Sequence, residues 1–314
     1  MNKPSNLAIW TGLITVYIVW GSTYLAIRFA IETIPPFLMA GARFMIAGLV
    51  LYTWRRLAGD PKPCRQEWIS AGIIGLLLLL IGNGGVTWAE QTVNSGIVAL
   101  LIGTVPLWVV LVEALRPGGR LPGWQGMAGV LLGVGGIFIL VNPWASRSGI
   151  SLDMAGTIVV LLAAASWAIG SVYSRSAELP KSPLMGTGLE MLVGGGALLL
   201  LGTFTGEWSQ VNWTAISTKS ILGVAYLIVF GSLIGYACYT WLLRVAPTSL
   251  VSTYAYVNPL IAILMGNILA QEPVTPQIIL AAAVIIGAVV LINLAHAPQA
   301  KLEPALAVVE SNCD

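Results

Sequence analysis

The feature that most constrains the fold is a succession of apolar runs, each about 20 residues long and separated from the next by a short polar or Pro/Gly-rich turn. A run of this length crosses the hydrocarbon core of a bilayer as an α-helix. The composition agrees, because 57% of the residues are hydrophobic, only 9% are charged and the mean hydropathy is +0.87. The sequence therefore predicts an all-α integral membrane protein with ten transmembrane helices, at residues 9–30, 37–57, 69–89, 95–115, 124–141, 154–175, 184–204, 219–241, 248–270 and 277–295.

The two halves of the chain resemble each other. An offset of about 147 residues aligns the start of each half, and an offset near 153 aligns the later part. The aligned pairs include Trp20 with Trp167, Arg28 with Arg175, Gly82 with Gly235 and Pro106 with Pro259. Each half holds five predicted helices, so the second half enters the membrane from the opposite side. This predicts two inverted five-helix repeats, at 1–147 and 148–296, an arrangement typical of secondary transporters.

The orientation follows from the basic residues. Most of the 15 lysines and arginines fall in the loops on the side of the N-terminus, and loops rich in Lys and Arg face the cytoplasm. We therefore expect both termini inside, with 297–314 as a disordered cytoplasmic tail. The first helix then runs outward and the sixth inward, which places the aligned residues Ile27 and Ser174 near the outer and inner mouths of one central path.

Several motifs resemble the EamA-type exporters of the drug/metabolite transporter superfamily. They are the run WGSTYLAIR at 20–28, Gly-Ala-Arg-Phe at 41–44, the mid-helix prolines Pro106 and Pro259, and Gln-Glu-Pro at 271–273. The resemblance covers nearly the whole chain up to the tail. It implies a multi-pass protein of the bacterial inner membrane that exports small molecules, and it names no particular substrate.

Together these features predict a secondary transporter that exports small amphipathic metabolites, such as amino acids or drug-like compounds, by alternating access. A channel or facilitative permease is the alternative, although no ring of repeated carbonyls or charges occurs. An integral membrane enzyme is the third reading, disfavoured because the only histidine is His296 and no cluster has metal-ligand or nucleophile-base spacing. No cofactor or metal is expected. The expected partners are a small-molecule substrate and the lipid bilayer, with a monomeric or homodimeric protein, and the net charge of +2 is too small to indicate nucleic acid.

Polar and aromatic residues inside the helices are the candidates for substrate binding, because unpaired polar groups are costly in hydrocarbon. Their helical spacing places them on faces that either line a cavity or pack and hydrogen-bond between helices, and the sequence leaves both readings open. The candidate substrate-binding residues are Trp20, Tyr24, Asn83, Trp167, Tyr236, Tyr239, Tyr256 and Asn258.

Two charged residues lie well inside predicted helices and align in the repeat, Arg43 and Glu190. A charge at such a depth costs about 2.5 to 3.5 kcal/mol on insertion scales unless it is paired. Arg43 is expected either to support the structure or to hold a substrate carboxylate, and Glu190 is a candidate for coupling transport to protons. Four other charged residues near helix ends are expected to be ordinary snorkelling anchors, namely Arg28, Glu90, Glu113 and Arg175.

Overall fold

The computed structural model describes residues 5–116, 123–141, 153–246, 248–251 and 253–296. In this part of the chain every regular element is a helix and no strand occurs. Seven helical stretches are long and apolar enough to cross a membrane, and three further apolar helices are shorter, Trp124–Leu140, Val257–Ala270 and Pro276–Ile292. The prediction of an all-α membrane protein is confirmed. The seven longer stretches are Asn6–Ala30, Pro36–Leu57, Arg65–Ala89, Ser95–Leu115, Met154–Ser174, Pro183–Phe204 and Thr218–Leu243.

The helices begin and end within a few residues of the predicted runs. In chain order they are α1 (Asn6–Ala30), α2 (Pro36–Leu57), α3 (Arg65–Gly75), η1 (Leu76–Asn83), α4 (Gly84–Ala89), α5 (Ser95–Ile102), α6 (Val105–Leu115), α7 (Trp124–Val141), α8 (Met154–Ser174), α9 (Pro183–Phe204), η2 (Glu207–Gln210), α10 (Thr218–Tyr226), η3 (Leu227–Tyr236), α11 (Ala237–Val245), α12 (Thr248–Val251), α13 (Tyr254–Ala270) and α14 (Pro276–His296). The predicted tail, 297–314, lies outside the described residues.

Two of the predicted continuous helices are interrupted. The run 95–115 breaks between α5 and α6, where Pro106 is near the start of α6, and the run 248–270 divides into α12 and α13, with Pro259 inside α13. Proline lacks the amide proton that an uninterrupted helix needs. The two irregular regions touch, because a Cβ atom added at Gly103 would lie 3.1 Å from Cγ of Pro259.

Two membrane-spanning stretches contain π-helical segments at positions that align in the repeat, η1 and η3. Each contains a glycine against which a tryptophan of the other half packs. A Cβ atom at Gly82 would lie 3.1 Å from the ring of Trp167, and one at Gly235 would lie 2.8 Å from Nε1 of Trp20. Such π-helical segments are frequent at functional sites, and here they adjoin the middle of α1 and α8.

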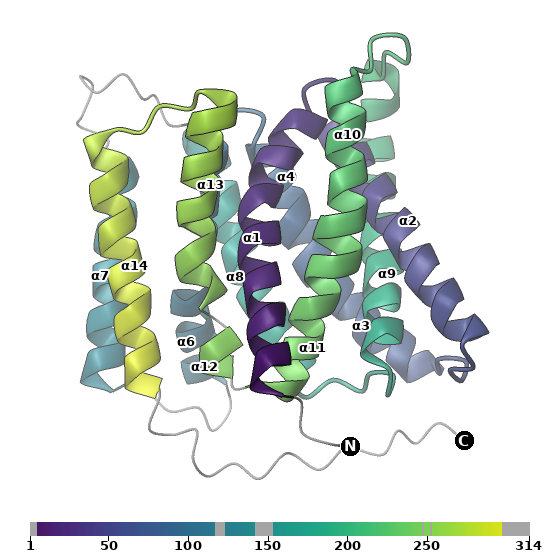
Figure 1. Ribbon diagram of the computed structural model, residues 1–314, viewed down its shortest axis with the longest axis horizontal. Coiled ribbons are helices and arrows are strands. Elements are labelled where there is room, and N and C mark those ends of the chain that lie inside the picture. The colour runs from purple at the N-terminus through teal and green to yellow at the C-terminus, as the bar shows by residue number, and fades with distance from the viewer. Residues whose placement is uncertain (1–4, 117–122, 142–152, 247, 252, 297–314) are drawn as a thin grey trace.

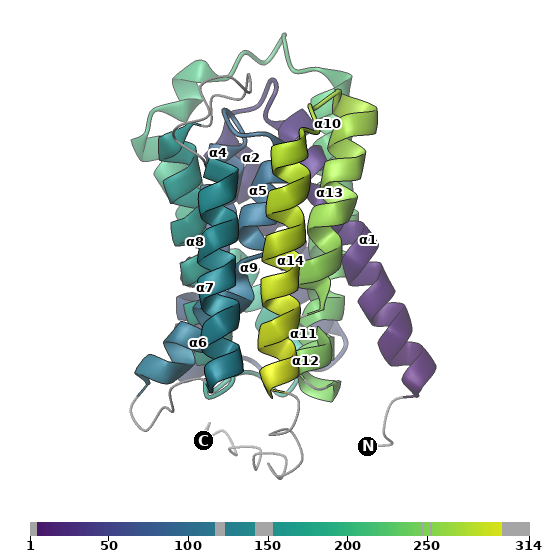
Figure 2. The same ribbon diagram turned by 90° about the vertical axis from the view of Figure 1, so that its left-hand side faces the viewer.

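The bundle is broad, with paired helices at its two edges. In Figure 1 α7 and α14 lie side by side at the left edge, while α2 and α9 lie towards the right, and Figure 2 shows α7 and α14 from the front. The interface between α2 and α9 is close because it is lined by glycines. A Cβ atom at Gly41 would lie 2.8 Å from the backbone nitrogen of Leu199, and one at Gly188 would lie 3.1 Å from that of Tyr52.

Two carboxylates, buried Glu207 and partly exposed Glu272, fix connections at the end of the bundle where α1 finishes. Glu207 accepts hydrogen bonds from the amides of Phe37 and Leu38 at the start of α2, at 3.2 and 2.8 Å. Glu272 accepts from the amides of Ser95 and Gly96 at the start of α5, at 2.9 and 3.2 Å. The free amides at a helix start favour a negative charge. Each carboxylate therefore ties a later loop to a helix of the first half.

Candidate functional site

Five aromatic side chains meet in the interior, and we refer to them as the aromatic cluster. Trp20 lies at its centre, and ring-centroid distances from Trp20 range from 4.8 Å to Tyr239, through 5.5 Å to Tyr254 and 5.9 Å to Trp167, to 6.3 Å to Tyr236. The members come from α1, α8, η3, α11 and α13. Several pairs are edge-to-face, the geometry that aromatic rings prefer.

Hydrogen-bond donors at the edge of the cluster are left without acceptors. Trp20 Nε1 donates to the carbonyl of Gly231 at 3.4 Å. In contrast, Trp167 Nε1 and Ser171 Oγ lie near the Tyr239 hydroxyl but are buried without a well-formed hydrogen bond. An unpaired buried donor costs about 1 to 3 kcal/mol. A ligand with an acceptor group in this place would relieve that cost.

One of the two charged candidates adjoins the cluster. The Tyr236 hydroxyl donates to Oε2 of Glu190 at 2.6 Å, and both residues are buried. This contact joins η3 to α9 and brings an ionisable group to the edge of the aromatic surface. Sequence reasoning had named both residues but had not predicted that they would touch.

The other charged candidate, Arg43, is buried at 4% exposure. Its Nε donates to Oγ of Ser232 at 2.9 Å, and its guanidinium lies 4.4 Å from the centroid of the Phe44 ring. Its Nη1 has no hydrogen-bond partner. Arg43 therefore ties α2 to η3 and still has one free donor.

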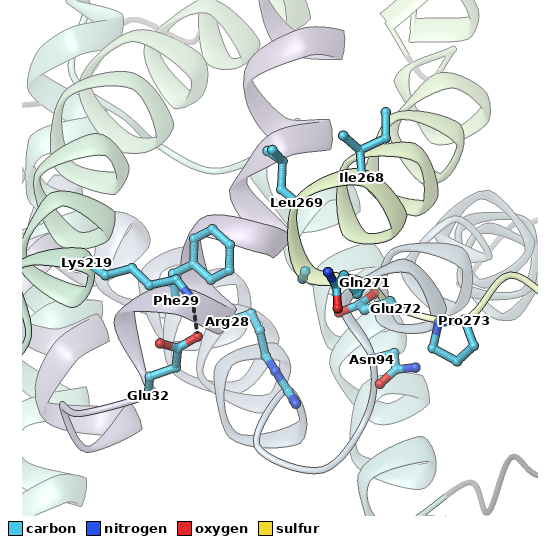
Figure 3. Close-up of a pocket in the computed structure, with 11 residues that line it drawn as sticks. Arg28, Phe29, Glu32, Asn94, Lys219, Ile268, Leu269, Gln271, Glu272 and Pro273 are labelled. Carbon is cyan, nitrogen blue, oxygen red and sulfur yellow. Dashed lines mark hydrogen bonds and ion pairs between the residues drawn. The ribbon is translucent and has the colours of Figure 1, made fainter.

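A cleft of about 500 Å³ opens at the end of the bundle where α1 finishes. In Figure 3 Arg28 lies between Glu32 on one side and Asn94 and Glu272 on the other. Lys219 Nζ bonds to Oε1 of Glu32 at 2.6 Å, and Arg28 Nη1 donates to the main-chain carbonyl of Glu90. None of the predicted substrate-binding residues lines this cleft, which is formed by Arg28, Phe29, Glu32, Asn94, Lys219 and 268–273.

One face of α1 connects the cleft with the aromatic cluster. Trp20, Tyr24 and Arg28 follow one another at four-residue intervals, so they share a side of the helix. Eight residues of α-helix span about 12 Å. Tyr24, which lies between the other two on this face, packs against a buried hydrophobic cluster.

The predicted site residues divide into two groups. Four of them form most of the aromatic cluster, namely Trp20, Trp167, Tyr236 and Tyr239. Asn83, Tyr24 and Asn258 have other surroundings. The structure describes the backbone of Tyr256 within α13 but not its side chain.

Asn83 has a local contact within its own helical stretch, whereas Asn258 joins two helices. The Thr87 hydroxyl donates to the carbonyl of Asn83 at 2.8 Å. Asn258 is 3% exposed, and in the amide orientation that satisfies its neighbours it donates to the carbonyls of Tyr254 and Tyr17, at 3.3 and 3.2 Å. It thereby links α13 to α1 beside the Pro259 kink, in the way that small polar side chains join membrane helices.

Sequence reasoning missed two residues of this region. Tyr254 was absent from the candidate set, and it is a member of the aromatic cluster. Glu90 was expected to be a snorkelling anchor, and this was wrong. Its side chain is fully buried at 0% exposure, and neither carboxyl oxygen has a hydrogen-bond partner. Among the described residues no group of three His, Cys, Asp or Glu side chains could hold a metal ion.

Comparison with known proteins gives consistent matches along the whole chain. The model of the EamA-like transporter family matches residues 7–142 and again residues 154–294. YedA, an inner membrane transporter of Escherichia coli named as uncharacterized, is 40% identical over 291 residues, which cover 92% of this chain and 91% of YedA. A chloroplastic WAT1-related protein of Arabidopsis thaliana is 28% identical over 90% of this chain and 69% of its own length. A crystal structure of a protein with 21% sequence identity superposes with a TM-score of 0.63, covering 95% of this chain and 100% of the other, which supports the fold.

Proposed function

Because the chain belongs to the EamA-like transporter family, it is a membrane transporter, and we propose that it exports small amphipathic metabolites, such as amino acids or drug-like compounds, by alternating access around the aromatic cluster. The observation that carries this proposal is the cluster itself. It combines five aromatic rings in edge-to-face and tilted contact with the donors of Trp167 and Ser171, which lack a well-formed hydrogen bond. Such a surface suits a substrate with an apolar body and an acceptor group.

The proposed mechanism needs two inverted five-helix repeats, 1–147 and 148–296, which together give ten transmembrane helices. Reciprocal contacts support this arrangement. Trp20 packs on Gly235 and Trp167 packs on Gly82. Because Trp20 aligns with Trp167 and Gly235 aligns with Gly82, each of these contacts is the counterpart of the other in the repeat. At the interface of α2 and α9, the contacts of Gly41 with Leu199 and of Gly188 with Tyr52 exchange in the same way. Such symmetry lets the halves swap conformations at little cost in energy.

The charged candidates receive separate roles in this proposal. Arg43 keeps one free donor while its other bond fixes η3, so it serves the structure and can also hold a substrate carboxylate. Glu190 is buried against Tyr236 at the cluster, and we assign it the coupling of transport to protons. Tyr256 and Asn258 remain proposed contacts on α13.

The inner membrane is the proposed location, since the YedA relative is named an inner membrane transporter. Both termini are proposed to face the cytoplasm, on the basis of the basic loops. Figure 1 is consistent with a common side, because α1 begins and α14 ends at the same end of the bundle. The transporter is proposed to work as a monomer or a homodimer without a cofactor.

Counterflow in proteoliposomes tests the proposal. Vesicles that contain the purified protein are loaded with a candidate substrate and diluted into a trace of the same compound carrying a label. A carrier accumulates label transiently inside, because exchange is faster than net loss. A channel gives no overshoot, and an enzyme converts the labelled compound. Absence of overshoot for every substrate that moves across the membrane would reject the carrier mechanism.

A further inference from the structure

Glu90 presents an unusual combination of charge and burial. It directly follows α4, and both of its carboxyl oxygens are inaccessible and lack a hydrogen-bond donor. Glu190, the carboxyl of the proposed coupling site, has a donor in Tyr236. An ionised carboxylate without water or donors is costly in a protein interior, and such a group is neutralised instead.

The surroundings of Glu90 do not supply the missing partner. The ionisable groups that interact electrostatically with Glu90 are Tyr24 and Arg28 of α1, Arg43 of α2, and Glu272 of the connection after α13. Arg28 donates to the main-chain carbonyl of Glu90 rather than to its carboxyl group. The free Nη1 of Arg43 does not reach it either. The two arginines therefore attract the carboxylate only through space, and Glu272 opposes them.

The connection that begins at Glu90 is fastened to three other elements. Besides the Arg28 contact with α1, Thr92 donates to Oδ2 of Asp153 before α8 at 2.6 Å. Ser95 and Gly96 bond to Glu272, which follows α13. The connection from 90 to 95 is thus the point where these helices are held together at this end of the bundle, and its movement would bring water to Glu90.

We propose that Glu90 is a proton-binding site that controls this end of the transporter. The carboxyl group carries a proton while the connection 90–95 is closed, and it releases the proton to the entering water when the connection opens. This inference rests on the proposed alternating access. The proton is taken up from and returned to the same side, so Glu90 sets the balance between open and closed states, whereas net proton coupling remains with Glu190.

The sign of the pH effect follows from this exchange. One proton is bound in the closed state and released on opening, so acid favours the closed state and rising pH favours opening. Binding of a single proton changes the opening equilibrium by at most about tenfold per pH unit. Asp153 does not explain such a change, because its hydrogen bond with Thr92 lowers the pKa of Asp153 and keeps it ionised.

Opening of this end can be measured from the accessibility of position 27, and the assay does not require a known substrate. Ile27 lies on α1 between Tyr24 and Arg28 and is 2% exposed. We would place Ile27→Cys in a background without the three native cysteines, reconstitute the full-length protein and measure its reaction with a membrane-impermeant maleimide from pH 5 to pH 8. Thr214→Cys, on the exposed connection before α10, corrects for ionisation of the thiol itself. The corrected Ile27→Cys rate is expected to rise with pH.

Glu90→Gln tests whether Glu90 causes this pH dependence, because glutamine has the shape of a protonated glutamate and is likewise neutral. In a Glu190→Gln background, which removes the pH response assigned to the coupling carboxyl, the Ile27→Cys rate of this variant is expected to stay low and independent of pH. The matched control is Glu32→Gln, which removes a half-exposed carboxylate at the same end and should keep the wild-type pH dependence. A wild-type pH dependence in Glu90→Gln would overturn the proposal, as would its loss in Glu32→Gln.

Infrared spectroscopy provides an independent measurement on the purified protein. A carbonyl-stretch band of protonated carboxylic acid should be present at neutral pH, lose its Glu90 component in Glu90→Gln and show a shift of that component in Glu90→Asp. A spectrum unchanged by both substitutions would show that Glu90 is ionised and would also reject the proposal.

Failure of this inference can be told apart from failure of the transport mechanism. Ser174→Cys reports the opposite mouth and should react more slowly whenever Ile27→Cys reacts faster. Reciprocal rates with an unaltered pH response in Glu90→Gln reject only the proton site. Rates that rise and fall together reject alternating access itself.

Discussion

The contact between Trp20 and Gly235 yields a quantitative prediction. A Cβ atom at Gly235 would lie 2.8 Å from Nε1 and 2.9 Å from Cδ1 of Trp20, closer than real Cβ atoms approach. In Gly235→Ala the indole must therefore move, and it is held on its other sides by Tyr239 and Tyr254. Overpacking of this kind costs about 1 to 3 kcal/mol. Part of this cost is offset, because alanine inside a helix is more stable than glycine by about 0.5 to 1 kcal/mol.

The net expectation for Gly235→Ala is a loss of about 1 to 2 kcal/mol in the free energy of unfolding. Gly82→Ala should lose less, since its Cβ atom would lie 3.1 Å from the Trp167 ring and the ring can give way by a few tenths of an ångström. Gly135→Ala is the matched control, because no atom lies within 4 Å of its added Cβ. That control should be as stable as the wild type or slightly more stable.

Reversible unfolding in mixed detergent micelles measures these differences, with tryptophan fluorescence as the signal. The predicted order of stability is Gly135→Ala, then Gly82→Ala, then Gly235→Ala. The reasoning would be refuted if Gly235→Ala were as stable as Gly135→Ala, because Trp20 would then not be packed as described.

Three further predictions concern the site and its supports. Tyr254→Ala should weaken substrate binding by about 1 to 3 kcal/mol, measured by ligand-dependent thermal stabilisation, while Tyr52→Ala, which removes a ring outside the cluster, should not. Glu190→Gln should abolish the dependence of transport on a pH gradient and leave counterflow intact, and an unchanged dependence would remove Glu190 from coupling. Glu207→Gln should lower stability by about 0.3 to 2 kcal/mol through the loss of a charge at the start of α2, while the more exposed Glu32→Gln should have little effect on the same thermal unfolding assay.

The helices could be predicted from sequence because hydrocarbon imposes a length and a composition on every segment that crosses it. The predicted end at Ala30 agrees with α1, and the predicted end at Leu57 agrees with α2. The aligned tryptophans, Trp20 and Trp167, were identified because the repeat preserved them in both halves, and they do meet. Local pattern and internal similarity were sufficient for these features.

Two features could not be predicted in this way: the position where a helix is interrupted, and the burial of a side chain at a helix end. The sequence gives one apolar run at 248–270, whereas α13 begins only at Tyr254. The phase of this helix decides which tyrosine faces α1, so the preference for Tyr256 over Tyr254 could not be justified from spacing. Glu90 was misjudged because a helix end in a sequence predicts contact with water, whereas in the folded protein this side chain is fully buried.

Positions that align between the two halves carry different side chains at the two ends of the bundle. At the offset of 153 residues Glu90 aligns with Leu243, an apolar residue packed against the core near Val16 and Leu242. The arginine that aligns with Arg28 is Arg175, and it forms an ion pair of 2.6 Å with Glu113, both side chains being partly exposed. An exposed ion pair contributes about 0 to 1 kcal/mol and is weakened by salt. Opening at that end should therefore respond to ionic strength, whereas opening at the Glu90 end should respond to protons. Under the proposed alternating access, the solution on each side would then set which facing state is favoured, even though the two halves resemble each other in sequence.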